Sequence, residues 1–148
     1  MKIFMTGGTG FVGSYLSREL AVQGHEVTIL SRRERANPAG SRISYLTGNP
    51  TQEGPWMSAV PDHDWVINLA GASIFNRWTG EVKRTVHDSR IFTTRNLTKA
   101  LAAGDRRQLF CSTSAIGYYG GRGEEVLTED SAPGSDFLAN LALEWEAE

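Results

Sequence analysis

The chain has 148 residues, of which 40% are hydrophobic and 22% are charged, and 16 are glycines. This length and composition suit one soluble globular domain with a buried core and exclude a fibrous repeat or a disordered tail. A net charge of -2 gives no basic field, which argues against nucleic acid as a general partner. The single cysteine excludes an internal disulfide, and the apolar run at residues 3–5 is too short for a membrane span or a signal peptide. We therefore expect a cytoplasmic protein that does not bind a membrane.

Short apolar runs alternate along the chain with stretches of helical spacing. Strands are predicted at residues 2–6, 25–30, 42–46, 65–69 and 109–114. Helices are predicted around Leu16, after an N-cap at Thr79, and from Ser135 or Asp136 onward. This alternation predicts the α/β class, a Rossmann-type doubly wound parallel β-sheet with helices on both faces, in one domain over residues 1–148.

Two further features concern the fifth predicted strand. Cys111 lies inside this apolar strand, and we expect it in the core. A loop of about 20 residues follows the strand, and long ordered loops in compact domains are usually functional. The three histidines show no metal-ligand spacing, so no metal site is predicted.

The strongest motif is a glycine triplet between the first strand and the first helix. Gly7 lets the chain turn sharply, Gly10 removes a side chain where a pyrophosphate approaches the backbone, and Gly13 lets the helix pack closely. The helix N-terminus, at Phe11 and Val12, offers N–H groups and a partial positive charge to the phosphates. The motif therefore predicts dinucleotide binding, and the alternative is a structural turn without a ligand.

A basic turn follows the second predicted strand, where an acidic residue would hold the ribose hydroxyls of NAD. Arg32 and Arg33 stand there instead, and their guanidiniums suit the 2′-phosphate of NADP. The sequence therefore predicts NADP in preference to NAD. The alternative is a solvated turn in which these arginines and Arg35 surround Glu34.

Several later motifs carry a family resemblance: Asn68-Leu69-Ala70-Gly71, Arg77-Trp78-Thr79, Ser89-Arg90, Ser112-Thr113-Ser114-Ala115, Ile116-Gly117-Tyr118-Tyr119-Gly120 and Thr128-Glu129-Asp130. With the glycine triplet, they make the whole chain resemble the extended short-chain dehydrogenase/reductase superfamily, in its branch of NAD-dependent epimerase/dehydratase-like proteins. The resemblance implies a nicotinamide cofactor across the carboxyl ends of the strands. It assigns cofactor contacts to Leu69, Ala70 and Gly71, and an adenine contact to Asn49, whose side-chain carbonyl would accept from the amine. It also implies a chain of about twice this length.

Enzymes of the superfamily usually carry a Tyr and a Lys four residues apart on the helix after the fifth strand, for proton exchange. Phe137 and Leu141 stand in those places, and neither side chain can transfer a proton. The resemblance leaves Ser114 as a hydrogen-bond donor to the substrate, with Tyr118 or Tyr119 as a substitute proton donor. Alternatively, these hydroxyls satisfy backbone groups and the tyrosine rings pack under the loop.

Two functions stay open at this point. One is an NADP-dependent oxidoreductase or epimerase acting on a small carbonyl or sugar-like substrate, and the other is a non-catalytic dinucleotide-binding protein with a regulatory or structural role. Arg90 is expected either to bind a substrate anion or to form an ion pair with a carboxylate such as Glu144. The resemblance also leaves a homodimer open, through the helices on either side of the fifth strand.

Overall fold

The structure is a computed structural model that describes residues 1–37 and 39–148. These residues form two compact units, Met1–Ser112 and Thr113–Glu148, and each is described here by itself. Among the helices of the described residues, none has the length and apolar character that a membrane span requires.

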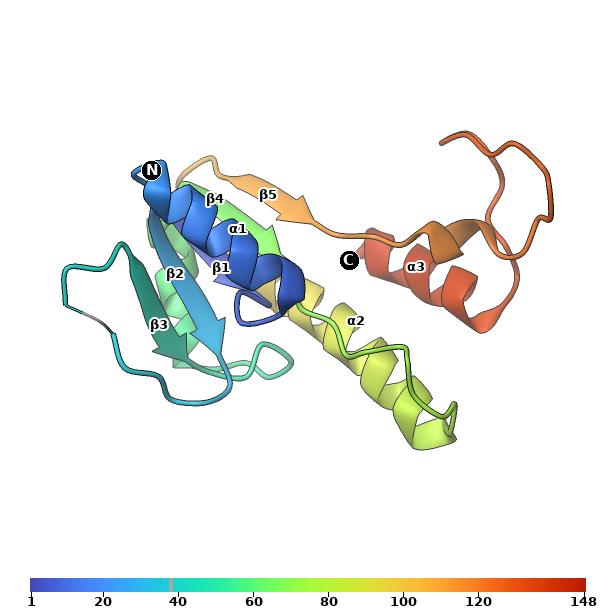
Figure 1. The fold of residues 1–148 in the computed structure, drawn as a ribbon, viewed down its shortest axis with the longest axis horizontal. Helices are drawn as coiled ribbons and strands as arrows, with labels where there is room; N and C mark the ends of the chain where they lie inside the picture. Colours follow the sequence, from blue (N-terminus) through green and yellow to red (C-terminus); the bar gives the residue numbers. More distant parts are fainter. Residues whose placement is uncertain (38) are drawn as a thin grey trace. The chain divides into compact units, whose positions relative to one another are not determined.

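The first unit is built on a five-stranded sheet (Figure 1). The strands are β1 (Lys2–Thr6), β2 (Glu26–Ser31), β3 (Ile43–Thr47), β4 (Trp65–Asn68) and β5 (Leu109–Ser112). Their order is β3-β2-β1-β4-β5, and every neighbouring pair is parallel. In this register, Met5 of β1 lies between Ile29 of β2 and Ile67 of β4. The predicted parallel sheet is confirmed.

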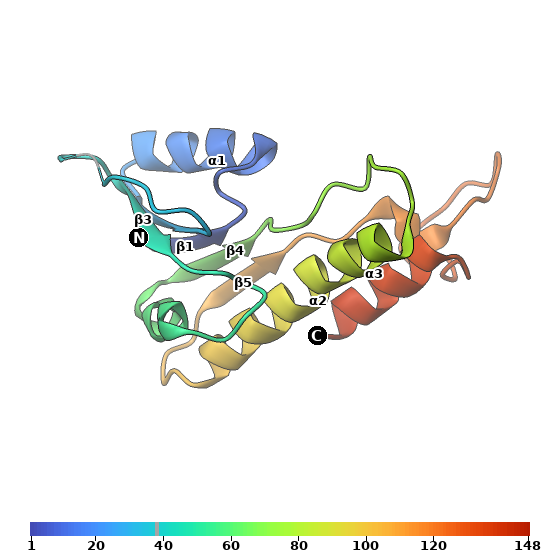
Figure 2. The same cartoon turned by 90° about the horizontal axis from the view of Figure 1, so that it is seen from below.

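Helices cover both faces of this sheet. Figure 2 shows α1 (Phe11–Val22) on one face and α2 (Gly80–Ala102) on the other. A 3-10 helix, η1 (Pro55–Asp62), packs beside α2. The hydroxyl of Thr79 accepts a hydrogen bond from the Val82 amide at 3.3 Å, which confirms the predicted N-cap of α2. The doubly wound arrangement predicted from the sequence is therefore present.

Two hydrophobic cores result, one on each face of the sheet. Ile3 and Met5 of β1 belong to the core beneath α1, where Leu20 packs. Phe4, between them in sequence, belongs to the core beneath α2 and η1, where it stacks on Trp56. Full burial of a large apolar side chain contributes about 1.5–3 kcal/mol, so a strand buried on both faces must be apolar at nearly every position.

The second unit contains a short 3-10 helix, η2 (Ile116–Tyr119), and the helix α3 (Phe137–Ala147). Asp136 caps α3 by accepting hydrogen bonds from the amides of Leu138 and Ala139, both at 2.9 Å. This helix begins where the sequence predicts it. Its contacts with η2 hold the unit together, and its buried residues are Ala139, Leu141, Ala142 and Trp145.

One prediction about the core is wrong. Cys111 is exposed, not buried. It pairs with Ile67 in the register of β4 and β5, and β5 is the last strand of the sheet. Helix α1 packs mainly against β2 and β3, away from β5. An apolar pattern alone does not distinguish an edge strand from a central one.

Candidate cofactor-binding site

A cleft of about 470 Å³ lies at the carboxyl edge of the sheet, where the loops after β1, β2, β3 and β4 meet. It is lined by seven residues that the sequence analysis assigned to the cofactor, Gly7, Gly10, Arg32, Asn49, Leu69, Ala70 and Gly71. Segments up to 64 residues apart in sequence are thus brought to one site, because parallel strands all end at the same edge.

The three glycines of the motif differ in what their backbone requires. Gly7 has a φ of +70°, and a Cβ there would collide with the Leu69 carbonyl. A Cβ on Gly13 would collide with the carbonyl oxygen of Gly7. Gly10 has an ordinary φ of -82°, and its Cβ would meet only the Gly7 oxygen, at 3.2 Å. Folding therefore requires Gly7 and Gly13, whereas Gly10 leaves space at the wall of the cleft.

The N-terminus of α1 carries no side-chain cap. Gly10 is the N-cap residue and supplies no side-chain acceptor for the amides of the first turn. The side chains of Phe11 and Val12 are 97% and 59% exposed and lie on the outer surface of α1 beside Tyr15, away from the cleft. Any contact of these two residues with a ligand in the cleft would therefore use their backbone N–H groups.

The basic turn after β2 does not place its arginines alike. Arg32 lines the cleft, whereas Arg33 does not. The Ser31 hydroxyl fixes the turn, donating to the Arg33 carbonyl at 2.8 Å and accepting from the Arg33 amide at 3.3 Å. Arg35 lies over the ring of Tyr45, 5.6 Å from its centroid. Arg32 is thus the guanidinium best placed to meet a ligand.

Asn49 lines the cleft after β3, as expected, but its side-chain oxygen is already engaged. It accepts hydrogen bonds from the Thr51 amide at 3.2 Å and from the Thr51 hydroxyl at 3.0 Å. This turn positions both residues at the cleft wall. The local hydrogen bonds are typical of an Asn that shapes a loop.

Asn68 joins the strand ends beneath the cleft. It is fully buried, and its oxygen accepts from the Thr6 hydroxyl at 2.6 Å and the Ala70 amide at 3.3 Å. Its side-chain amide donates to Thr94 at 3.0 Å and to Ser112 at 3.1 Å. One side chain thus links β1, β4, β5 and α2. Asn68 had no predicted role of its own, although a polar residue at the end of an apolar strand was the available signal.

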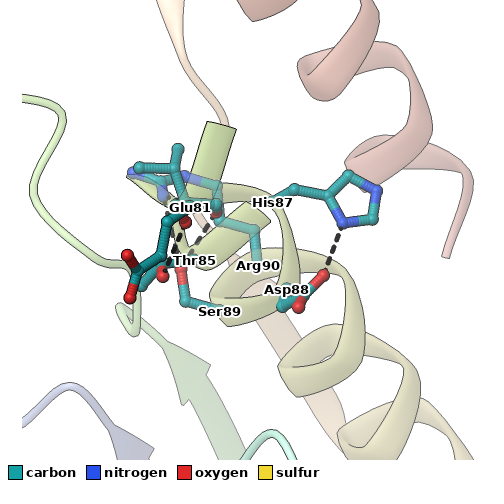
Figure 3. A network of polar contacts seen from close by, with 7 residues as sticks. Glu81, Thr85, His87, Asp88, Ser89 and Arg90 are labelled. Carbon is teal, nitrogen blue, oxygen red and sulfur yellow. Dashed lines mark hydrogen bonds and ion pairs between the residues drawn. The ribbon is translucent and has the colours of Figure 1, made fainter. Parts of the chain in front are cut away.

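Ser89 and Arg90, whose side chains on α2 are drawn in Figure 3, fasten the loop after β4 to this helix through Ala72. The Ala72 amide donates to the Ser89 hydroxyl at 2.9 Å, and the Arg90 guanidinium donates to the carbonyls of Ala72 at 3.1 Å and Val86 at 3.0 Å. A Cβ added to Gly71 would lie 3.1 Å from the central carbon of the Arg90 guanidinium, so a larger residue at position 71 would press on this side chain. Burial lowers the pKa of Arg90. These contacts hold the cleft-lining segment in place.

Helix α2 forms one wall of the cleft through four polar residues, Thr85, Asp88, Ser89 and Thr93. Thr85, Ser89 and Thr93 recur at four-residue spacing and therefore share one face of the helix. Thr85, Asp88 and Thr93 were not predicted as site residues. This polar spacing within an otherwise packed helix was the signal that could have found them.

The three residues assigned to catalysis lie together in the second unit. Ser114, Tyr118 and Tyr119 line a pocket of about 400 Å³ with Glu129 and Glu146. The Ser114 hydroxyl donates to the Glu146 carboxylate, and the two tyrosine rings meet edge to face at 5.0 Å. Glu146, on α3, was not predicted.

Comparison with known proteins gives a consistent result. The sequence profile of the NAD dependent epimerase/dehydratase family matches residues 3–147. The chain is 40% identical to the Epimerase family protein YfhF of Bacillus subtilis, over all of this chain and 49% of that protein. It is 35% identical to the Epimerase family protein SDR39U1 of Bos taurus, over 99% of this chain and 48% of that one.

Solved structures agree with this result. The human epimerase family protein SDR39U1, crystallised with NADPH, superposes with a TM-score of 0.79 and is 31% identical, over 99% of this chain and 48% of that chain. The chain thus spans about half the length of the curated relatives it matches. With its parallel sheet and glycine turn, the chain belongs to the NAD-dependent epimerase/dehydratase family.

Proposed function

We propose that this chain binds NADPH in the cleft at the carboxyl edge of its sheet and forms the cofactor-binding part of an oxidoreductase or epimerase. The substrate class is a small carbonyl compound or a sugar. The observation that carries this proposal is the position of Gly10 and Arg32 on one cleft, the first open to a pyrophosphate and the second to a phosphate. The NADPH bound to the human relative supports the same assignment.

The residues present fit a dinucleotide. The uncapped N-terminus of α1 favours negative charge, and Gly10 offers no side chain that would obstruct a phosphate. Ala70 and Gly71 add small residues to the cleft lining beside the glycine turn. Arg32 would hold the adenosine end, where its guanidinium can form charge-assisted hydrogen bonds to a 2′-phosphate.

The cofactor preference is tested by comparing affinities for NADPH and NADH. Each charge-assisted bond contributes about 1.5–3 kcal/mol, so Arg32→Ala should lower the preference for NADPH about tenfold or more. Arg33→Ala is the matched control, because Arg33 does not line the cleft. An unchanged affinity ratio in Arg32→Ala would show that the turn only faces solvent.

For catalysis, we propose Ser114 with Tyr118 or Tyr119 as the proton-transferring group. A bound nicotinamide supplies hydride exchange at a substrate carbon, which leaves the chain to move a proton at the substrate oxygen. The Ser114 hydroxyl donates to Glu146 in the structure and would turn from that carboxylate to donate to the substrate oxygen, while a phenol in the same pocket can supply the proton. Phe137 and Leu141 carry no exchangeable side-chain proton.

The catalytic assignment is tested by replacing both tyrosines with Phe. Turnover on a panel of carbonyl and sugar substrates should fall by about 10²–10⁴, the usual contribution of general acid–base catalysis. NADPH affinity should stay unchanged, because neither tyrosine lines the cleft. Undiminished turnover would show that another group is the acid.

The second candidate is a non-catalytic dinucleotide-binding protein. The apolar residues at positions 137 and 141 favour it, because Leu141 is 5% exposed and packs as a core residue of α3. Tight NADPH binding without turnover on any substrate of the panel would support this function.

A further inference from the structure

We propose that the outer edge of β3 is a surface for pairing with a second copy of this chain, and that the side chain of Asn37 keeps this surface closed. The pairing is antiparallel, between the β3 strands of two copies related by a two-fold axis. This inference concerns association of the chain and does not depend on cofactor binding.

The outer edge of β3 consists of the backbone groups that point away from β2. Strand β3 is the first in the sheet order, and Figure 1 shows it at the margin of the sheet. At its two ends, the Arg42 carbonyl accepts a hydrogen bond from β2 and the Gly48 amide donates one to β2. Hydrogen bonds between parallel strands recur at every second residue, so the even-numbered positions bond β2. Ile43, Tyr45 and Thr47 therefore direct their N–H and C=O groups to the outer edge.

The side chain of Asn37 stands where a neighbouring strand would pair. Its Oδ1 accepts a hydrogen bond from the Tyr45 amide at 2.5 Å, and its Nδ2 donates to the Tyr45 carbonyl at 3.4 Å. These two bonds repeat the exchange that a hydrogen-bonded pair makes in an antiparallel ladder. The Ser41 hydroxyl likewise accepts from the Ile43 amide at 3.0 Å. Side chains from the segment between β2 and β3 thus close the edge.

The sequence of β3 is well suited to pairing with itself. Residues 43–47 read Ile-Ser-Tyr-Leu-Thr, with three residues that favour strands and no charge, Gly or Pro. Exposed edge strands of this kind are a usual route to association between sheets. Because Tyr45 is the middle residue, a two-fold axis there aligns all five residues of both copies. This self-complementary alignment closes after two copies, so the occupant that fits the edge is a second β3.

A positive charge adds to the closure. The Arg35 side chain is exposed, and its guanidinium lies over the Tyr45 ring, 5.6 Å from the centroid. Charged side chains are a common protection of edge strands against pairing. A two-fold axis at Tyr45 would bring the Arg35 side chains of both copies to one junction. Their repulsion opposes the dimer, and salt weakens that repulsion.

The experiment measures amide hydrogen exchange along β3 over about a hundredfold range of chain concentration, with sedimentation to follow the oligomeric state. In the unaltered chain, the Tyr45 amide should exchange slowly at every concentration. In Asn37→Ala, it should exchange about tenfold faster at the lowest concentration, because its acceptor is lost. Its exchange should then slow as the concentration rises and dimers form. Five paired residues form few bonds, so the dimer should be weak and should strengthen with salt.

Two variants serve as controls. Asn37→Asp keeps an acceptor for the Tyr45 amide and loses the donor, so exchange of this amide should stay within about twofold of the unaltered chain. Asn76→Ala removes an exposed asparagine that donates to the Ser73 carbonyl at 3.0 Å in another loop, and it should change neither exchange nor association. Asn37→Ser, whose side chain is too short to make both bonds, repeats the test should Asn37→Ala fold poorly.

Four outcomes would overturn the inference. Equal exchange of the Tyr45 amide in Asn37→Ala and the unaltered chain would show that Asn37 does not close the edge. Exchange in Asn37→Asp as fast as in Asn37→Ala would show that the acceptor is not what holds this amide. Fast exchange in Asn37→Ala at every concentration would show that the open edge does not pair. Association that slows exchange only at residues 109–112 would place the interface at β5, the opposite edge of the sheet.

Discussion

Replacing Gly10 with Val separates cofactor binding from folding. Gly10 has a φ of -82°, and a Cβ there would meet one atom, the Gly7 oxygen, at 3.2 Å. The Gly7 carbonyl oxygen must move by only a few tenths of an ångström, which costs little stability. A side chain at position 10 also lowers the conformational entropy of the unfolded chain, which favours folding. The free energy of unfolding should therefore change by no more than about 1 kcal/mol, which is a shift of about 2–4 °C in the melting temperature.

Binding should respond far more strongly than stability. The valine side chain would fill the space at the uncapped N-terminus of α1 that a pyrophosphate needs. We expect the affinity for NADPH, measured by calorimetric titration, to fall at least a hundredfold, or about 2.8 kcal/mol. Gly80→Val is the matched control, since a Cβ on Gly80 meets nothing within 4 Å and lies outside the cleft. Gly13→Val should instead unfold the chain. Unchanged NADPH affinity in Gly10→Val would refute the assignment of the phosphate site.

Three further predictions concern stability. Burial lowers the pKa of His63, so the unfolded chain binds the proton more tightly than the folded chain. The free energy of unfolding should therefore fall as the pH drops below about 6.5. Urea unfolding at about pH 7.5 and about pH 5 should show this fall, and His63→Gln should show a smaller one. An equally steep profile in that variant would assign the pH dependence to other groups. Asn68→Leu should destabilise the chain by about 1–3 kcal/mol, because it leaves the buried Thr6 hydroxyl without its acceptor, and a loss below about 0.5 kcal/mol in urea would contradict the network. Arg90→Met should cost about 1–2 kcal/mol by removing the donor to two carbonyls, whereas equal stability of Arg90→Met and the unaltered chain would show that the loop is held without it.

The sequence predicted the fold well because its signals were local. Apolar runs, the glycine at position 24 and the cap at Thr79 fix where elements begin and end, and the structure places them within one or two residues of the prediction. Strand ends were less certain, since β5 stops at Ser112 and not at residue 114. The side chains after a strand often have the same polarity as those within it. The sequence pattern therefore does not show where the hydrogen bonds between strands stop.

The candidate site was predictable where backbone geometry carries it. Gly7 has the positive φ that its motif requires, and Gly10 and Arg32 line the cleft. The partners of Asn68 and the wall residue Asp88 were not predictable, because they depend on which segments the sheet order brings together. Likewise, no local pattern indicates that Glu146 lies against Ser114, 32 residues earlier in the chain.

A crystal structure of the chain with NADPH bound would locate the cofactor directly. We expect the 2′-phosphate within hydrogen-bond distance of the Arg32 guanidinium, about 2.7–3.2 Å, and the pyrophosphate over Gly10 at the N-terminus of α1. A cofactor bound on another surface, or one whose 2′-phosphate points into solvent away from Arg32, would contradict this binding mode.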